Sequence, residues 1–124
     1  MESENENIFR HIGKAVIYSG AGLKAAWKNE MSFRTQTIVI ILMMPVGFWI
    51  GNTAVQWALL IGSSLLILIT ELLNSAVEKV VDRIGPEHHI LSKQAKDLGS
   101  AAAAISMLTA VIVWGLIVYE RFLQ

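Results

Sequence analysis

The sequence predicts an all-α membrane protein, with three transmembrane helices and an N-terminal amphipathic helix on the membrane surface. Of its 124 residues, 54% are hydrophobic and 16% are charged, and the mean hydropathy is +0.53. Two stretches, residues 35–70 and 98–119, contain no charged side chain, and a membrane span needs roughly 20 apolar residues. A soluble helical protein with buried hairpins is the alternative, which 36 consecutive uncharged residues disfavour. We expect a single membrane domain over residues 1–124.

The first element is expected over residues 8–32, as an amphipathic helix that lies on the membrane. At 100° per residue, four apolar side chains fall within an arc of about 100°, with basic side chains opposite. The apolar residues are Ile8, Phe9, Ile12 and Val16, and the basic ones are Arg10 and Lys14. Gly20 and Gly22 are expected to bend this helix, and the acidic residues 1–7 are expected to form a disordered tip.

The uncharged stretch that begins at residue 35 is long enough for two spans with a turn between them. Turn-forming residues cluster at Gly51-Asn-Thr53, so we expect spans over residues 35–50 and 54–73. A third span is expected over residues 98–119. It begins with small residues, which permit close approach of helices in lipid.

Lysine and arginine residues gather at one end of the predicted bundle. Residues 1–34 contain five of them and residues 71–97 contain four, whereas the turn at 51–53 has none and the C-terminal end has one. By the positive-inside rule, the N-terminus and the 74–97 segment lie in the cytoplasm, and the C-terminus lies on the periplasmic side. The formal net charge is zero, and without a dense basic patch we expect no nucleic-acid partner.

A polar stripe follows the second predicted span. Glu71, Asn74, Glu78 and Asp82 fall within an arc of about 80° on one helical face. Ionisable groups beside a membrane span are costly and commonly functional, although solvated interface charges are the plainer explanation. Carboxylates with a nearby amide suit a hard cation such as Mg²⁺, which usually binds together with phosphates. The chain has no cysteine, which excludes a thiolate metal site.

Phosphoryl transfer needs such a metal, cations for the remaining phosphate charge and a group that orients the nucleophile. The predicted cytoplasmic side carries candidates for each role. The carboxylates are Glu30, Glu71, Glu78, Asp82 and Asp97, and the cations are Lys14, Lys24, Lys28, Arg34 and Lys96. Glu71 lies closest to the acyl region of the membrane, so it is best placed to meet the hydroxyl of a lipid head group.

Four sequence blocks, in a fixed order, carry a resemblance to a known family. They are Ala25-Ala-Trp27-Lys-Asn29-Glu30-x-x-Phe33-Arg34, Glu71-Leu-Leu-Asn74-Ser-Ala-Val-Glu78, Val81-Asp82-Arg83-Ile84-Gly85 and Ala95-Lys96-Asp97-x-Gly99-Ser100-Ala101. From about residue 9 to residue 114, the chain resembles the prokaryotic integral-membrane diacylglycerol kinases of the Gram-negative type. The resemblance implies a homotrimer of three-span subunits in the bacterial inner (cytoplasmic) membrane. It also implies ATP-dependent phosphorylation of sn-1,2-diacylglycerol to phosphatidic acid, with Mg²⁺, at sites shared between neighbouring subunits.

The resemblance assigns a role to each matching position. Glu71 matches the general base for the lipid hydroxyl, Glu30 and Glu78 match metal-binding carboxylates, and Asn74 lies between them on the metal or the γ-phosphate. The positions expected to bind ATP are Lys14, Tyr18, Glu30, Glu78, His89, Lys96, Asp97 and Gly99, of which the two lysines hold the phosphates. The positions expected to bind the lipid substrate are Ala15, Trp27, Glu71 and Ser100.

Three positions depart from the family pattern. The family often carries an arginine near the position of His11, and here the nearest arginine is Arg10, one place earlier. Gln36 lies near a position where other members carry a carboxylate. Lys93 occupies a position where a small residue is common. Family roles are therefore not transferred to these positions.

Two alternative functions stay open at this point. Undecaprenol kinase is the related Gram-positive activity, and the Ala25–Arg34 block favours diacylglycerol over that lipid. A small non-enzymatic transporter or assembly subunit is the alternative from a different class. Transport sites tend to lie near the membrane midplane, whereas these charged residues cluster at the predicted cytoplasmic end.

Overall fold

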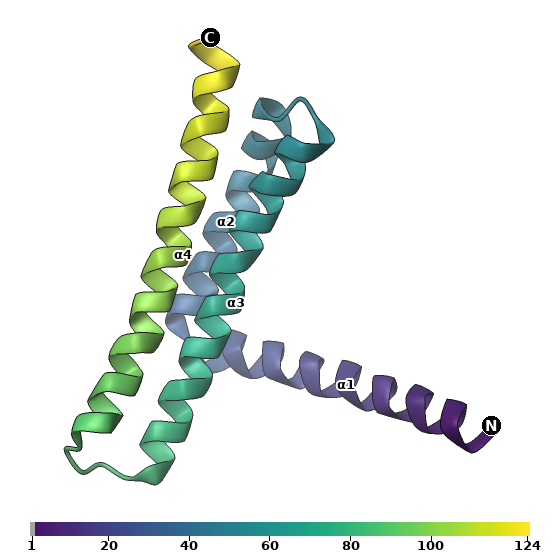
Figure 1. The fold of residues 1–124 in the computed structure, drawn as a ribbon, viewed down its shortest axis with the longest axis vertical. Coiled ribbons are helices and arrows are strands. Elements are labelled where there is room, and N and C mark those ends of the chain that lie inside the picture. The colour runs from purple at the N-terminus through teal and green to yellow at the C-terminus, as the bar shows by residue number, and fades with distance from the viewer. Residues whose placement is uncertain (1) are drawn as a thin grey trace.

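The computed structural model describes residues 2–124, with side chains from residue 4 onward. It contains four helices and, within that range, no strand: α1 (Glu2–Asn29), α2 (Met31–Ile50), α3 (Ala54–Ile84) and α4 (Ile90–Phe122). Helices α2, α3 and α4 form an elongated bundle, and α1 projects away from its side (Figure 1). The predicted all-α fold, with three long apolar helices and an N-terminal helix, is confirmed.

Helix α1 runs without interruption from Glu2 to Asn29, so two local predictions are wrong. No bend occurs at Gly20 or Gly22, where a Cβ would meet none of the described atoms within 4 Å. A glycine inside a helix costs about 1 kcal/mol relative to alanine but does not force a kink. The expected disordered tip is instead helical from residue 2, while residue 1 lies outside the described range. Acidic side chains favour a helix N-terminus, because they complement the helix dipole.

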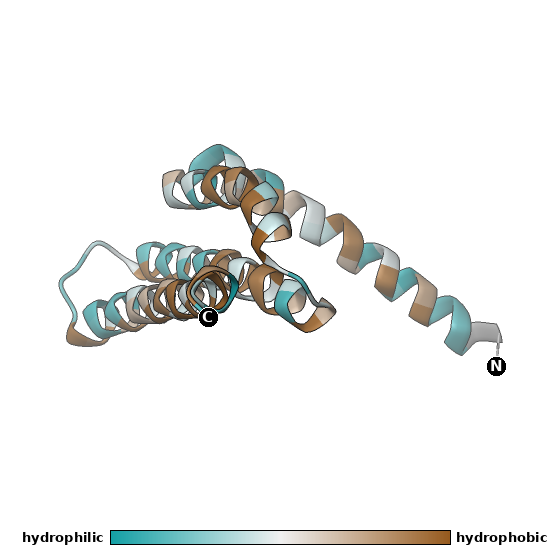
Figure 2. Ribbon diagram, turned by 90° about the horizontal axis from the view of Figure 1, so that it is seen from above, coloured by the Kyte–Doolittle hydropathy of each residue, from teal (hydrophilic) through white to brown (hydrophobic). Residues whose placement is uncertain are grey.

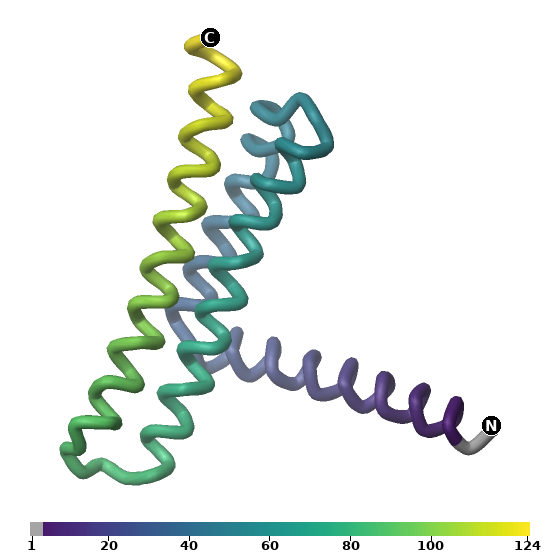
Figure 3. Tube along the Cα trace, in the orientation of Figure 1, coloured from purple at the N-terminus to yellow at the C-terminus, as the bar shows by residue number. Residues whose placement is uncertain are grey.

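A single non-helical residue, Glu30, joins α1 to α2. Its extended backbone (φ −112°, ψ 106°) ends one helix and begins the next, so the two helices diverge at this joint, as the trace in Figure 3 shows. Ala26 and Phe33, on either side of the joint, are each only 5% exposed. Their burial anchors the base of α1 while the rest of that helix remains exposed.

Helices α3 and α4 form a long antiparallel hairpin, the most extensively packed pair in the bundle. Both extend beyond the predicted spans, because the helices continue into charged sequence after the uncharged residues end. Polar contacts link them at mid-length, where Thr70 Oγ1 and Ser106 Oγ are 2.7 Å apart. The turn between them begins at Gly85, whose φ of 157° lies in a region that glycine adopts most readily.

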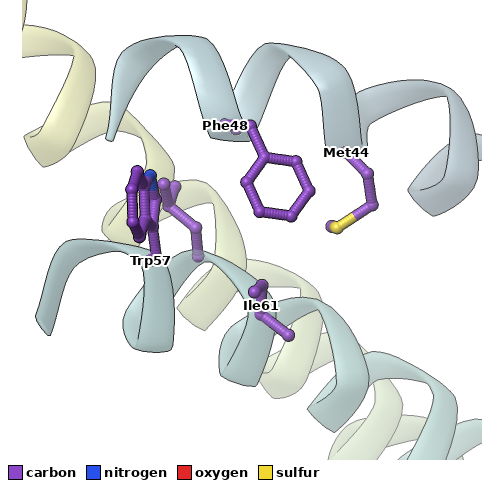
Figure 4. Close-up of a pocket in the computed structure, with 6 residues that line it drawn as sticks. Met44, Phe48, Trp57 and Ile61 are labelled. Atoms are coloured by element: carbon purple, nitrogen blue, oxygen red, sulfur yellow. The ribbon is translucent and has the colours of Figure 1, made fainter. Parts of the chain in front are cut away.

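The far end of the bundle, where α2 meets α3, contains the only cluster of large buried side chains within the described residues: Ile50, Leu60 and Ile117. In Figure 4, Met44 and Phe48 of α2 and Trp57 and Ile61 of α3 line a small apolar pocket between the helices. Trp57 Nε1 donates to the carbonyl of Gly51 at 3.0 Å. Arg121 and Glu120 bond to Asn52 and Gln56, at 3.0 and 2.8 Å, and tie the end of α4 to the α2–α3 turn.

Hydrophobic residues, brown in Figure 2, make up much of the bundle helices, and many of their large apolar side chains are exposed. In the most apolar 18-residue stretch of each of α2, α3 and α4, only 17% to 28% of the residues are buried within the chain. Each of these helices is long and apolar enough to cross a membrane. Exposed apolar surface on this scale is stable in lipid and not in water. The chain is therefore a membrane protein.

Candidate active site

Acidic residues of α3 lie near the α1–α2 joint, which is at the other end of α2 from the Ile50 cluster. Glu71 is buried, with 5% of its surface exposed, and Glu78 lies two turns later on the same helix, half-buried. The charges of both Glu78 and Glu30 act on the Glu71 carboxylate. The structure thus places Glu30, from the α1–α2 joint, near two carboxylates that lie two turns apart on α3.

Glu30 is held at this site by a residue that the sequence-based prediction missed. Within the described chain its side chain makes no capping hydrogen bond to α2. Its Oε1 instead lies 3.0 Å from Nζ of Lys79 on α3, and the Glu30 side chain is 21% exposed. The signal that could have identified Lys79 is its position next to Glu78, at the edge of the acidic stripe.

Asn74 lies on α3 between Glu71 and Glu78 and packs against Gly99 of α4. A Cβ at position 99 would overlap Asn74 Oδ1 and lie 3.3 Å from Asn74 Cγ, so only glycine permits this approach. Asn74 Oδ1 is buried, yet it has no hydrogen-bond partner among residues 4–124. A buried acceptor without a partner costs about 1–3 kcal/mol. A ligand group that reached this amide would recover that cost.

The start of α4 places two of the predicted nucleotide residues, His89 and Lys96, at a hollow of about 380 Å³ beside the α3–α4 turn. His89 caps α4, with its Nδ1 accepting from the Leu91 N–H at 3.1 Å. Lys96 and His89 both line the hollow, and Lys96 Nζ donates to Asp82 Oδ1 at 2.7 Å. Asp97 is exposed and accepts from Lys93 at 2.6 Å. Asp82, noted in the stripe but given no role, is therefore the partner of a predicted phosphate-binding lysine.

The predicted residues on α1 do not line the hollow beside the α3–α4 turn. Lys14, Ala15 and Tyr18 are exposed on α1. Trp27 is 45% exposed near the joint, and Ser100 is exposed on α4. Neither Lys14 nor Tyr18 lines the groove that contains Glu30.

A groove of about 500 Å³ separates the second half of α1 from α3, and Glu30 and Lys79 lie among its walls. Its other lining residues are small or apolar: Ser19, Gly22, Leu23, Ala25, Ala26, Leu72, Ser75 and Ala76. The groove therefore combines largely small or apolar walls with two charged side chains, Glu30 and Lys79.

The donor groups near Glu71 fit a hard cation in part. Among the described side chains, no group of three or more His, Asp or Glu residues is close enough to hold a metal ion without other ligands. Mg²⁺ commonly uses one or two protein carboxylates and takes its remaining ligands from phosphates and water. Glu30 and Glu78, with the unpartnered Asn74 Oδ1 nearby, match that incomplete set.

The fold and this acidic cluster define a helical membrane protein with charged side chains gathered where α3 passes the α1–α2 joint. The family model described as prokaryotic diacylglycerol kinase matches residues 17–118. The chain belongs to the prokaryotic diacylglycerol kinase family, as the resemblance of its four sequence blocks predicts.

Individual relatives match over nearly the whole chain. The diacylglycerol kinase of Escherichia coli strain K12 is 45% identical over 120 residues, which cover 97% of this chain and 98% of that protein. The diacylglycerol kinase of Haemophilus influenzae is 47% identical over 109 residues, 88% of this chain and 92% of the relative. That of Pseudomonas aeruginosa is 42% identical over 108 residues, 87% and 88% of the two chains.

Proposed function

We propose that this chain transfers the γ-phosphoryl group of ATP to the free hydroxyl of sn-1,2-diacylglycerol and thereby forms phosphatidic acid. Membership of the prokaryotic diacylglycerol kinase family supports the kinase activity. The observation that carries the proposed mechanism is the buried Glu71 beside Glu78 and Glu30. A buried carboxylate next to an apolar surface can meet both a lipid hydroxyl and a phosphate that arrives from water.

Glu71 is the proposed general base. Its carboxylate accepts the proton of the lipid hydroxyl as the hydroxyl oxygen bonds to the γ-phosphorus. The bond between that phosphorus and its bridging oxygen breaks, and ADP leaves with the bonding electrons. Such a transfer depends on positioning and electrostatics more than on covalent chemistry, which suits a site made of fixed charges on two packed helices.

Glu30 and Glu78 are the proposed metal ligands, with Asn74 on the metal or on the γ-phosphate. Three carboxylates in one place would repel the phosphates of ATP, so the site needs a cation. When bound there, Mg²⁺ would offset the negative charge of the phosphates and align them. The two carboxylates would hold the metal ion in one place, because Glu78 lies on a long helix and Glu30 lies at a joint with buried neighbours.

Lys96, His89, Asp97 and Gly99 are the proposed nucleotide residues of α4. Lys96 and His89 share the hollow beside the α3–α4 turn, so the phosphates would bind near Lys96 and the nucleoside nearer the turn. The ammonium of Lys96 would exchange Asp82 for a phosphate oxygen, which is a strong charge-assisted contact.

The proposed enzyme is a homotrimer with sites shared between subunits. Lys14 and Tyr18 are exposed on α1, and neither lines the groove that contains Glu30 or the hollow beside the α3–α4 turn. A neighbouring copy could receive them, and the apolar surface of the bundle could be covered there. Ala15, Trp27 and Ser100 are the proposed contacts for the lipid.

The proposed setting is the bacterial inner membrane, with the N-terminus and residues 74–97 in the cytoplasm and the C-terminus in the periplasm. The distribution of lysine and arginine supports this orientation. It places the acidic site on the side where ATP is available.

The proposal is tested with a panel of lipid acceptors. The full chain in mixed micelles receives γ-labelled ATP, Mg²⁺ and either sn-1,2-diacylglycerol or undecaprenol. We expect labelled phosphatidic acid and little transfer to undecaprenol. Preferential labelling of undecaprenol would overturn the substrate assignment, and a folded chain that labels neither lipid would overturn the kinase assignment.

A further inference from the structure

Lys79 is the basic side chain that contacts a carboxylate of the proposed metal site. Its Nζ lies 3.0 Å from Oε1 of Glu30, so the ion pair joins α3 to the α1–α2 joint. Lys79 is 58% exposed, whereas Glu30 is only 21% exposed. The carboxylate is therefore fixed in the structure, and the ammonium reaches it from the solvent side on a flexible stem.

The ion pair places a cation where the proposed function requires a different cation. A lysine ammonium and Mg²⁺ both bind carboxylate oxygen, but Mg²⁺ needs its oxygen ligands at 2.0–2.1 Å in near-ideal octahedral geometry. Two positive charges that share one carboxylate at such distances repel each other. The Lys79 side of this ion pair is exposed, and solvent weakens ion pairs of exposed lysines, so Lys79 can leave Glu30 when a stronger ligand arrives.

We propose that Lys79 is a tethered counter-ion, which occupies Glu30 in the absence of the metal–nucleotide complex and is displaced when that complex binds. This inference rests on the proposed function, specifically on Glu30 as a metal ligand. Lys79 offsets one of the three negative charges at Glu30, Glu71 and Glu78 in the resting protein. The metal must break the Glu30–Lys79 ion pair in order to bind, and this cost weakens metal binding. Lys79 therefore raises the metal concentration that the site requires.

The residue is a positioning and affinity-setting residue, since it acts through Glu30. The ion pair also fastens the joint from which α1 projects. Displacement of Lys79 frees this joint from α3, whereas the buried Ala26 and Phe33 continue to anchor it.

The test measures Mn²⁺ binding directly, by electron paramagnetic resonance of the free ion. The sample is the full chain in lipid bicelles with a non-hydrolysable ATP analogue. Lys79→Met should tighten Mn²⁺ binding about five- to tenfold, which corresponds to about 1–1.4 kcal/mol by the conversion of 1.4 kcal/mol per tenfold. Lys79→Arg keeps the charge and should bind Mn²⁺ within twofold of the unsubstituted chain.

A matched control distinguishes the direct contact of Lys79 with Glu30 from the longer-range effect of any positive charge on α3. Arg83 lies one turn further along α3 and is exposed, so Arg83→Met removes the same charge from nearly the same face and should change binding less than twofold. Glu30→Gln should weaken binding, and in that background Lys79→Met should have little further effect, because its target carboxylate is gone.

The outcomes separate the counter-ion role of Lys79 from the assignment of Glu30 as a metal ligand. If the unsubstituted chain binds Mn²⁺, Glu30→Gln weakens binding and Lys79→Met leaves it unchanged, the counter-ion proposal is overturned while the metal site stands. Equal effects of Lys79→Met and Arg83→Met would also overturn it. If Glu30→Gln does not alter Mn²⁺ binding, Glu30 is not a ligand, and the metal assignment and the inference fail together.

Discussion

Asn74 of α3 occupies the space that a side chain at Gly99 of α4 would need. A Cβ at Gly99 would overlap Asn74 Oδ1, and that oxygen is buried without a hydrogen-bond partner among the described residues. The contact therefore fixes both the spacing of the two helices and the direction of the amide. It links the acidic face of α3 to the proposed nucleotide residues of α4.

The replacement Gly99→Ala should destabilise the α3–α4 pair and reduce activity. The added methyl group has no space, and overpacking of this kind costs about 1–3 kcal/mol. The measurement is the free energy of unfolding in detergent together with the rate of phosphate transfer. Gly62→Ala is the matched control, because no described atom lies within 4 Å of its Cβ position. It should be neutral or stabilising by up to about 1 kcal/mol.

A second substitution checks the reason for that effect. Adding Asn74→Ala to Gly99→Ala should restore part of the lost stability, since it removes the side chain with which the methyl group collides. It should not restore activity, because Asn74 belongs to the proposed site. Equal stability of the single and double variants would show that the collision with Asn74 is not the cause.

The replacement Thr70→Val should weaken the bundle without altering the chemistry. It removes the 2.7 Å contact with Ser106, and polar contacts between membrane helices contribute about 0.6 kcal/mol on average, up to about 1.7. Unfolding in detergent should show a loss in this range, with the Km values for both substrates unchanged. Thr109→Val is the control, since the Thr109 hydroxyl bonds only to Ile105 O within its own helix. A similar loss in both variants would contradict the assignment of that energy to the interhelical contact.

The replacement Lys96→Met should raise the Km for ATP about tenfold or more. A hydrogen bond to a charged group contributes about 1.5–3 kcal/mol, and the variant loses one such contact to the phosphates. Steady-state kinetics with varied ATP would measure the change, while the Km for diacylglycerol should stay constant. Arg121→Met, which removes a positive charge from the far end of the bundle, should leave both constants unchanged. An unaltered Km for ATP in the Lys96 variant would remove Lys96 from the nucleotide site.

Mixed oligomers test whether sites are shared between subunits. Lys14→Met and Glu71→Gln should each reduce activity strongly when every subunit carries the same change. If α1 of one subunit completes the site of the next, co-expressed chains that carry one change each should form some sites without either defect. Such mixtures should regain measurable activity. Mixtures no more active than the two pure variants would indicate that each site is built within one chain.

The fold could be predicted from sequence because its elements depend on local composition. Uncharged runs indicated where the three long apolar helices lie, and Gly51-Asn-Thr53 marked the turn between α2 and α3. The helix lengths could not be obtained in this way, since α3 continues to Ile84 and α4 begins at Ile90, beyond the uncharged residues. The continuous α1 was also missed, because glycine weakens a helix without necessarily bending it.

The site was predictable in its α3 stripe and less so in its partners. Glu71, Asn74 and Glu78 share a face by helical periodicity alone. Contacts such as Glu30 with Lys79 and Asp82 with Lys96 depend on how separate helices pack. Periodicity carries no information about such packing, so these pairs became visible only in the structure.

The central claim is that the buried Glu71 accepts the proton of the lipid hydroxyl. The most direct measurement is phosphate transfer from γ-labelled ATP to diacylglycerol by Glu71→Gln, with Glu120→Gln at the far end of the bundle as the matched control. We predict a loss of at least about 100-fold for Glu71→Gln, in keeping with the contribution of a general base, with ATP-analogue binding and unfolding close to those of the unsubstituted chain. The control should keep full activity. Undiminished transfer by a folded Glu71→Gln protein would contradict the account.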